Sequence, residues 1–150
     1  MLKTWMKPLA VATLLAGIVA VPALADDTPN ALNGAKVVAA EDVAKAQAAG
    51  AVVVDTRVAS EFAEGHIKGA VSVPYREKSQ KSVAFDASQD EFNLAKLPAD
   101  KGAAVVLYCN GPECWKSFKS SSAAIKGGYT NVLWYRLGFP DWKAKGLPVE

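Results

Sequence analysis

Two short apolar runs constrain the fold of this chain more than any other feature. Residues 51–54 (Ala-Val-Val-Val) and residues 103–108 (Ala-Ala-Val-Val-Leu-Tyr) are continuous and rich in valine. Such runs are typical of strands covered on both faces, because a strand with one wet face alternates apolar and polar residues. Stretches of helical character follow both runs, so the pattern predicts a parallel α/β sheet in one domain.

The other predicted elements are short and alternate in type. Further strands are expected at residues 36–39, 71–73 and 131–135, and helices at residues 41–49, 60–63, 115–126 and 140–145. Gly50 and the pair Gly127-Gly128 stand where helix C-terminal caps are common. We therefore expect an α/β fold with a central parallel sheet of about five strands and helices on both faces.

Residues 75–100 form the least regular part of the sequence. One short helix is expected at residues 88–95, with Ser88 as its N-cap and Glu91 three residues further on. Connections of this length are often functional. The segment is expected either to form a lid over a site or to lie along the sheet edge.

The N-terminal residues 1–25 are typical of an export signal. Lys3 and Lys7 supply a basic start, residues 9–21 are almost wholly apolar, and Ala25 ends a small-x-small cleavage site. An uncleaved membrane anchor is the alternative, but the apolar run is short for a span of about 20 residues. We expect cleavage after Ala25 and a periplasmic or secreted protein without a membrane partner.

The mature chain is expected to have a flexible tail at residues 26–34 and one domain at residues 35–150. Loss of the two signal lysines would lower the formal net charge from +2 to zero. The mature part also has no basic run interleaved with aromatic residues, which nucleic-acid binding would favour. We therefore expect no binding to nucleic acid. A monomer is also expected.

A turn-rich loop with a cysteine at its start follows residues 103–108. Cys109 would lie at the carboxyl edge of the sheet, where open α/β folds bind ligands. Gly111 and Pro112 favour a tight turn, whose N–H groups can converge on one anion together with a helix N-terminus. That field favours a thiolate over a thiol. The candidate substrate-binding loop comprises Asn110, Gly111, Pro112, Glu113, Cys114, Trp115 and Lys116.

The roles of the two cysteines stay open at this stage. Cys109 is either a nucleophile or a buried core cysteine, since free cysteines are often buried. Cys114 is a disulfide partner, a resolving thiol or a wall residue of the loop. Trp115 either lines the mouth of the site or packs on the helix. A single histidine, His66, cannot complete a four-ligand zinc site with the two cysteines, so no metal is expected.

In combination, several motifs resemble those of the rhodanese-like domain family. They are Asp55-Thr56-Arg57, Glu61-Phe62, Gly65-His66-Ile67-Lys68-Gly69-Ala70, Tyr108-Cys109 with its loop, Gly128-Tyr129-Thr130-Asn131-Val132, Gly138 and Trp142. The resemblance covers about residues 35–150. It implies a sulfurtransferase without a cofactor: Cys109 would take sulfur from a small donor such as thiosulfate and pass it to a thiol or protein acceptor.

The loop departs from the pattern of that family. Active members commonly carry Cys-x-x-Gly-x-Arg, whereas here glycine is third and Cys114 stands sixth. Related phosphatases and arsenate reductases place an arginine seventh, where this chain has Trp115, which argues against phosphate or arsenate chemistry. Lys116 and Lys119 offer positive charge, but a lysine is a point charge and not a bidentate fork.

We also predict supporting roles for three residues and two alternative functions for the chain. Asp55 and Arg57 are expected to tie a strand end to neighbouring loops, and His66 to hydrogen-bond the backbone of its own turn. Two other functions compete with sulfur transfer. One is a thiol–disulfide redox protein that uses Cys109 and Cys114, and the other is a catalytically silent binding module.

Overall fold

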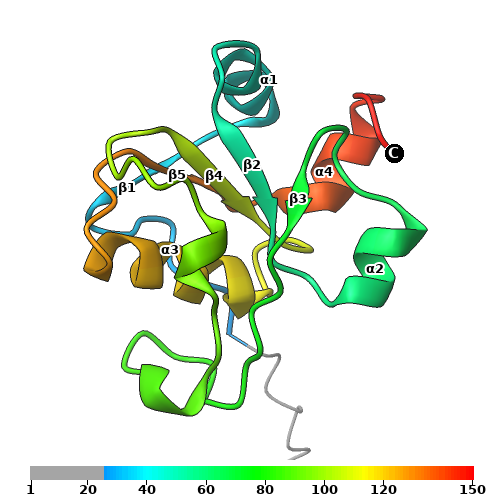
Figure 1. Ribbon diagram of the computed structural model, residues 1–150. Helices are drawn as coiled ribbons and strands as arrows, with labels where there is room; N and C mark the ends of the chain where they lie inside the picture. The colour runs from blue at the N-terminus through cyan, green and yellow to red at the C-terminus, as the bar shows by residue number, and fades with distance from the viewer. Residues whose placement is uncertain (1–25) are drawn as a thin grey trace, which may run out of the picture.

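A five-stranded parallel sheet forms the centre of the molecule (Figure 1). The computed structural model describes residues 26–150, so the proposed signal peptide lies outside the described part. The strands are β1 (Ala35–Val37), β2 (Val52–Asp55), β3 (Val71–Ser72), β4 (Val105–Tyr108) and β5 (Val132–Tyr135). Their order is β1-β5-β4-β2-β3, which puts the two predicted apolar runs side by side in the middle. The predicted fold class is confirmed.

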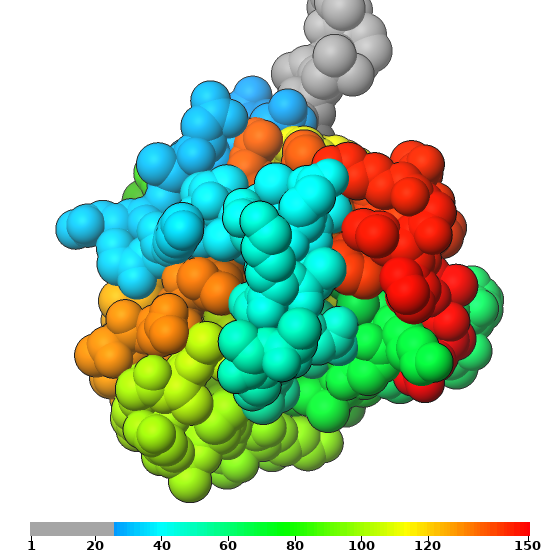
Figure 2. Space-filling view, turned by 90° about the horizontal axis from the view of Figure 1, so that it is seen from above, coloured from blue at the N-terminus to red at the C-terminus, as the bar shows by residue number. Residues whose placement is uncertain are grey.

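Helices cover both faces of this sheet. They are α1 (Ala40–Ala48), α2 (Ala59–Glu64), α3 (Trp115–Lys126) and α4 (Gly138–Ala144). Helices α1 and α4 pack on one face, and α3 packs on the other. Figure 2 shows α1 in cyan with the C-terminal segment in red beside it, and an ion pair of 3.0 Å between Lys145 and Glu41 joins the two.

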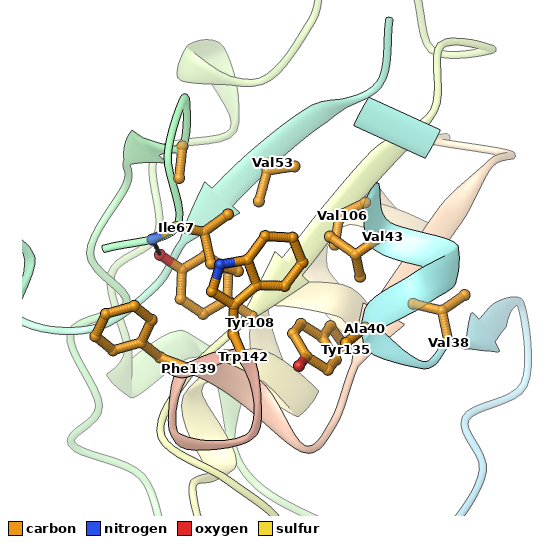
Figure 3. Close-up of a cluster of buried hydrophobic side chains, with 11 residues drawn as sticks. Val38, Ala40, Val43, Val53, Ile67, Val106, Tyr108, Tyr135, Phe139 and Trp142 are labelled. Atoms are coloured by element: carbon orange, nitrogen blue, oxygen red, sulfur yellow. Dashed lines mark hydrogen bonds between the residues drawn. The ribbon is translucent and has the colours of Figure 1, made fainter. Parts of the chain in front are cut away.

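The face under α1 and α4 is packed with large side chains. Figure 3 shows Trp142 and Phe139 of α4 around Tyr108 of the sheet, and Val43 of α1 beside Val106. The opposite face presents Leu107 and its apolar neighbours to α3. Successive residues of β4 thus point to opposite faces, and every residue of this strand is buried. This explains why the central strand has no polar position.

Helix α3 buries polar side chains as well as apolar ones. Phe118 packs edge-on against Trp134, and Ser117 accepts a hydrogen bond from the indole of Trp134 at 3.0 Å. Lys119 is completely buried. A lysine so placed needs a partner, because an unpaired buried charge is costly.

Residues 75–100 provide the partners of Lys119. Its ammonium group lies 2.8 Å from the Glu77 carboxylate and 3.9 Å from that of Asp90, and it donates to the hydroxyl of Ser79 at 2.8 Å. Burial would raise the pKa of Asp90, but hydrogen bonds from Ser79, Tyr75 and the Lys78 amide outweigh it and lower the pKa to about 2. The segment is therefore fixed to α3 by a buried charge network.

The helix expected at residues 88–95 is wrong. The structure has two short 3₁₀ helices there, Ala87–Gln89 and Leu94–Lys96. Asp86, and not Ser88, caps the first one, and Asn93 caps the second. Asp and Asn side chains that bond nearby amides compete with a continuous helix. Asp90 turns inward to the buried network instead of continuing the helix.

We predict that Lys119→Met destabilises the protein. The substitution keeps the length of the side chain but leaves Glu77 and Asp90 as buried carboxylates without their cation, which costs about 3 kcal/mol of unfolding free energy. Urea denaturation measures this loss, and amide hydrogen exchange should rise first in residues 75–100. Lys81→Met, at an exposed position of the same segment, serves as the control. Equal denaturation midpoints for the two variants would contradict the prediction.

Candidate active site

The carboxyl ends of three strands meet at one edge of the sheet. Asp55, Tyr108 and Tyr135 pair in register across β2, β4 and β5. Cys109 follows directly at the end of β4, with 1% of its surface exposed. The central strand therefore delivers this cysteine to the edge where open α/β folds place their ligands.

A disulfide joins Cys109 to Cys114 in this structure, and the two Cα atoms are 6.2 Å apart. Cys114 is the N-cap residue of α3 and is half-buried, so it is the more accessible of the two cysteines. No side chain caps the first turn of α3. The N–H groups of a first helical turn have no partner within the helix and carry partial positive charge.

The backbone of the loop is fixed from within and from α4. The Cys114 amide donates to the carbonyl of Gly111 at 3.0 Å, and Gly111 has the positive φ of 126° that favours glycine. The carbonyl of Cys109 accepts from the Phe139 amide at 2.9 Å. Gly138 lies directly against the same carbonyl, where a Cβ atom would collide with it. The start of α4 therefore sets the position of the cysteine.

A buried ion pair lies beneath the loop. Arg57 donates to both carboxylate oxygens of Asp55, the shortest contact being 2.7 Å, and to the carbonyl of Gly65 at 2.7 Å. Tyr108 donates its hydroxyl to Asp55 at 2.6 Å. Burial, with the charge of Asp55 and the hydrogen bond to it, raises the pKa of Tyr108 well above its usual value. The phenol therefore stays a donor at neutral pH.

This ion pair reaches the loop through Asn110. The amide group of Asn110 donates to both carboxylate oxygens of Glu61 at 3.1 and 3.2 Å, and its oxygen lies 3.5 Å from a guanidinium nitrogen of Arg57. The residue after Cys109 is thus held by α2 and by the end of β2.

Residues 26–34, expected to form a flexible tail, contact the loop through Thr28. Thr28 is 3% exposed, and its amide and hydroxyl donate to the carbonyl of Pro112 at 2.8 and 2.6 Å. Arg136, the residue after β5, donates to the carbonyl of Thr28 at 2.7 Å. These hydrogen bonds join the segment to the loop and to the end of β5. The flexibility of the segment and the bounds of the domain stay predictions.

Trp115 and His66 are the remaining candidate residues. Trp115 is buried, packs against Phe118 and donates its indole N–H to the carbonyl of Asp26 at 3.0 Å. His66 lies away from the cysteines, with Nδ1 2.9 Å from the carbonyl of Phe62 and its ring stacked on Phe62. Its other nitrogen is 3.4 Å from a carboxylate oxygen of Glu150.

Charges of both signs stand around the loop. Lys116 lines a groove of about 390 Å³ together with Arg76, Lys78, Val58 and other residues that follow β2 and β3. Glu77 in the same groove is neutralised by its ion pair with buried Lys119. Glu113 brings a negative charge close to Gly111. The groove is therefore positive, whereas the tip of the loop is negative.

Residues 26–150 contain neither a membrane-spanning helix nor a cluster of metal-binding side chains. Among residues 26–150, no helix has both the length and the apolar character to cross a membrane. The same part of the chain holds no group of three or more His, Cys, Asp and Glu side chains arranged for a metal ion.

The sequence predicts the place of the loop at a strand end but not most of the contacts that hold it. Gly138 belongs to a motif, but its contact with Cys109 joins the end of β4 to the start of α4. Thr28 has no local sequence signal. Glu61 also belongs to a motif, and nothing in its neighbourhood indicates a hydrogen bond to Asn110.

Known proteins are similar to this chain in sequence. The model of the Rhodanese-like domain family matches residues 39–145. Thiosulfate sulfurtransferase 16, chloroplastic, of Arabidopsis thaliana is 26% identical over 102 residues, which are 68% of this chain and 82% of that protein. The HTH-type transcriptional regulator Rv0324 of Mycobacterium tuberculosis is 29% identical over 111 residues, 74% of this chain. The chain spans only 42% of the length of this regulator.

A solved structure extends the comparison to the fold. The thiosulfate sulfurtransferase of Pseudomonas aeruginosa aligns with 77% of this chain and 20% of its own, with a TM-score of 0.56 and 24% identity. At this level of identity the likeness concerns the fold alone.

We predict that Gly138→Ala displaces the cysteine loop. Its φ of 67° already disfavours a side chain, and the new Cβ would also overlap the Cys109 carbonyl. Gly146→Ala is a matched control, because Gly146 has φ 66° but no neighbouring atom within 4 Å. Positive φ alone costs about 1–2 kcal/mol. Urea denaturation should show a loss at least about 2 kcal/mol larger for Gly138→Ala. Equal losses would contradict a role of this contact.

Proposed function

The chain belongs to the rhodanese-like domain family, and we propose that its reduced form is a sulfurtransferase. In this proposal the Cys109 thiolate attacks the outer sulfur of thiosulfate or a similar sulfane donor and releases sulfite. The persulfide on Cys109 then passes its outer sulfur to a thiol or protein acceptor. No cofactor takes part in these steps.

The observation that carries the proposal is the place of Cys109 at the end of the central strand. The loop after it leads directly into the uncapped first turn of α3. Preorganised N–H groups of this kind stabilise developing negative charge without reorganising during the reaction. The similarity to a thiosulfate sulfurtransferase over 82% of that protein adds support.

The groove beside the loop suits an anionic donor. Lys116 and Lys78 supply positive charge, which raises the local concentration of anions and their rate of association. The contacts beneath the loop that link Asp55, Arg57 and Asn110 keep the nucleophile in place. Such positioning by rigid surroundings supplies much of the rate of a displacement reaction.

The cellular setting forms part of the proposal. The N-terminal sequence favours export with cleavage after Ala25, and an oxidising compartment outside the cytoplasm suits a chain with a disulfide. The partners are then a small sulfur donor and a thiol or protein acceptor. We propose that the exported protein acts as a monomer.

A second candidate function rests on the disulfide itself. The Cys109–Cys114 pair would serve a thiol–disulfide redox protein that exchanges electrons with a partner. In that case the reduced protein would reduce disulfides of a partner but would release no sulfite from thiosulfate.

We predict that sulfite release from thiosulfate requires the reduced protein and Cys109. Reduced wild type and Cys114→Ser should both release sulfite, and mass spectrometry should find one added sulfur atom on Cys109 in the variant. Cys109→Ser and the oxidised wild type should release none, because neither offers a thiolate at the end of β4. Sulfite release from Cys109→Ser at the rate of wild type would refute the proposal.

We also predict opposite effects from two charges beside the loop. Lys116→Ala should raise the KM for thiosulfate by about threefold to tenfold at low ionic strength, because it removes a cation from the groove. Glu113→Gln should lower the KM, since it removes a negative charge close to Gly111. Both effects should shrink as salt increases.

Lys81→Ala, at an exposed position outside this groove, is the control for these kinetics. A KM that changes equally in all three variants, or that ignores salt, would contradict an electrostatic role of the groove.

A further inference from the structure

The second cysteine of the loop gives the site an acceptor of its own. We propose that Cys114 resolves the persulfide on Cys109 and releases sulfide, so that the reduced chain reduces sulfane sulfur. This inference rests on the proposed function, since it requires a persulfide on Cys109. It adds sulfide as a product, oxidation of the two cysteines to a disulfide, and a role for Cys114 at the sixth position of the loop.

Cys109 and Cys114 lie within bonding reach of one another. The two sulfur atoms bond to one another within the loop, between the end of β4 and the start of α3. The turn that brings them together is fixed by the hydrogen bond from the Cys114 amide to Gly111 and by the contact of Gly138 with Cys109. The Cys114 thiolate is therefore held close to the inner sulfur of a persulfide on Cys109.

The two cysteines differ in their access to solvent. Cys109 is 1% exposed, whereas Cys114 is half-buried. An external thiol must enter the loop to reach a persulfide, while Cys114 is already beside it. Well-oriented intramolecular reactions have effective concentrations of about 10⁵ M or more, far above any free thiol in a cell. Internal attack therefore outruns transfer to a small acceptor.

The step balances without an outside oxidant. The Cys114 thiolate attacks Sγ of Cys109, a bond forms between the two cysteine sulfurs, and the bond to the outer sulfur breaks. The electron pair leaves with that sulfur as hydrosulfide. Two thiolates are oxidised to one disulfide, and one sulfane sulfur is reduced to sulfide. With thiosulfate as donor, one reduced chain yields one sulfite, one sulfide and the disulfide that the structure holds.

Further turnover needs a reductant, which we assign by class as a dithiol protein or a small thiol. Thiol–disulfide exchange depends on access to the sulfur under attack. The more accessible Cys114 is therefore the sulfur that the reductant attacks first, and Cys109 leaves as the thiolate that accepts the next sulfur. The same loop thus links sulfur transfer to a supply of thiol electrons.

A single-turnover experiment tests this inference. Reduced protein, freed of reductant without air, is mixed with thiosulfate, and sulfite, trapped sulfide and remaining thiols are counted. Wild type should give sulfide and sulfite in equal amounts and lose both thiols. Cys114→Ser should give sulfite alone, keep the added sulfur atom, and release sulfide only when external thiol is supplied. Sulfide release should be at least about 100-fold slower in Cys114→Ser than in wild type.

The possible outcomes distinguish a failure of this inference from a failure of the proposed sulfurtransferase function. A stable persulfide in wild type, with sulfite but no sulfide, overturns the role of Cys114 and leaves the sulfurtransferase standing. Absence of sulfite from both reduced proteins overturns the proposed function itself. Cys114→Ala repeats the test if the serine variant does not fold, and the ratio of sulfide to sulfite in wild type needs no variant.

Discussion

The buried ion pair of Asp55 and Arg57 is the interaction on which the candidate site depends. Both side chains are removed from water, and such a pair is tolerable only where its remaining donors and acceptors find partners. Here Tyr108 completes the hydrogen bonds of Asp55, and the carbonyl of Gly65 accepts from Arg57. The guanidinium also lies 4.3 Å from the ring centre of Phe139. One pair thus joins β2, β4, the end of α2 and the start of α4.

The ion pair of Asp55 and Arg57 and its neighbours set the position of the cysteine loop. Arg57 and Glu61 hold the side chain of Asn110, and α4 holds the carbonyl of Cys109. Thr28 adds a contact from the other side of the loop. These contacts come from four separate parts of the chain and hold the backbone around Cys109. A backbone held in this way would serve the proposed sulfur transfer and the proposed disulfide exchange alike.

Local patterns predicted the parts of the structure that local physics decides. The apolar runs of β2 and β4, the helix after Cys114 and the place of Cys109 followed from burial, propensity and turn chemistry. Lys119 illustrates what was missed, since a lysine on a helix is normally solvated and its burial depends on carboxylates about 30 to 40 residues away. Thr28 and Gly138 matter through contacts that no sequence window contains. The prediction of a helix at residues 88–95 was wrong because Asp86 and Asp90 accept hydrogen bonds from nearby amides. Asp90 also belongs to the buried charge network.

The sixth loop position decides what this rigid frame can do. An arginine there would bind an anionic donor and stay chemically inert, because guanidinium neither attacks sulfur nor gives up its proton. Cys114 reverses both properties: it contributes no fixed positive charge, and it would be a nucleophile next to the proposed persulfide. Attraction of the donor would then come from Lys116, at the end of the loop, and from the neighbouring groove. In the proposed cycle, the chain would give up affinity for its donor and gain an internal route to sulfide, which requires electrons from a thiol partner in each cycle.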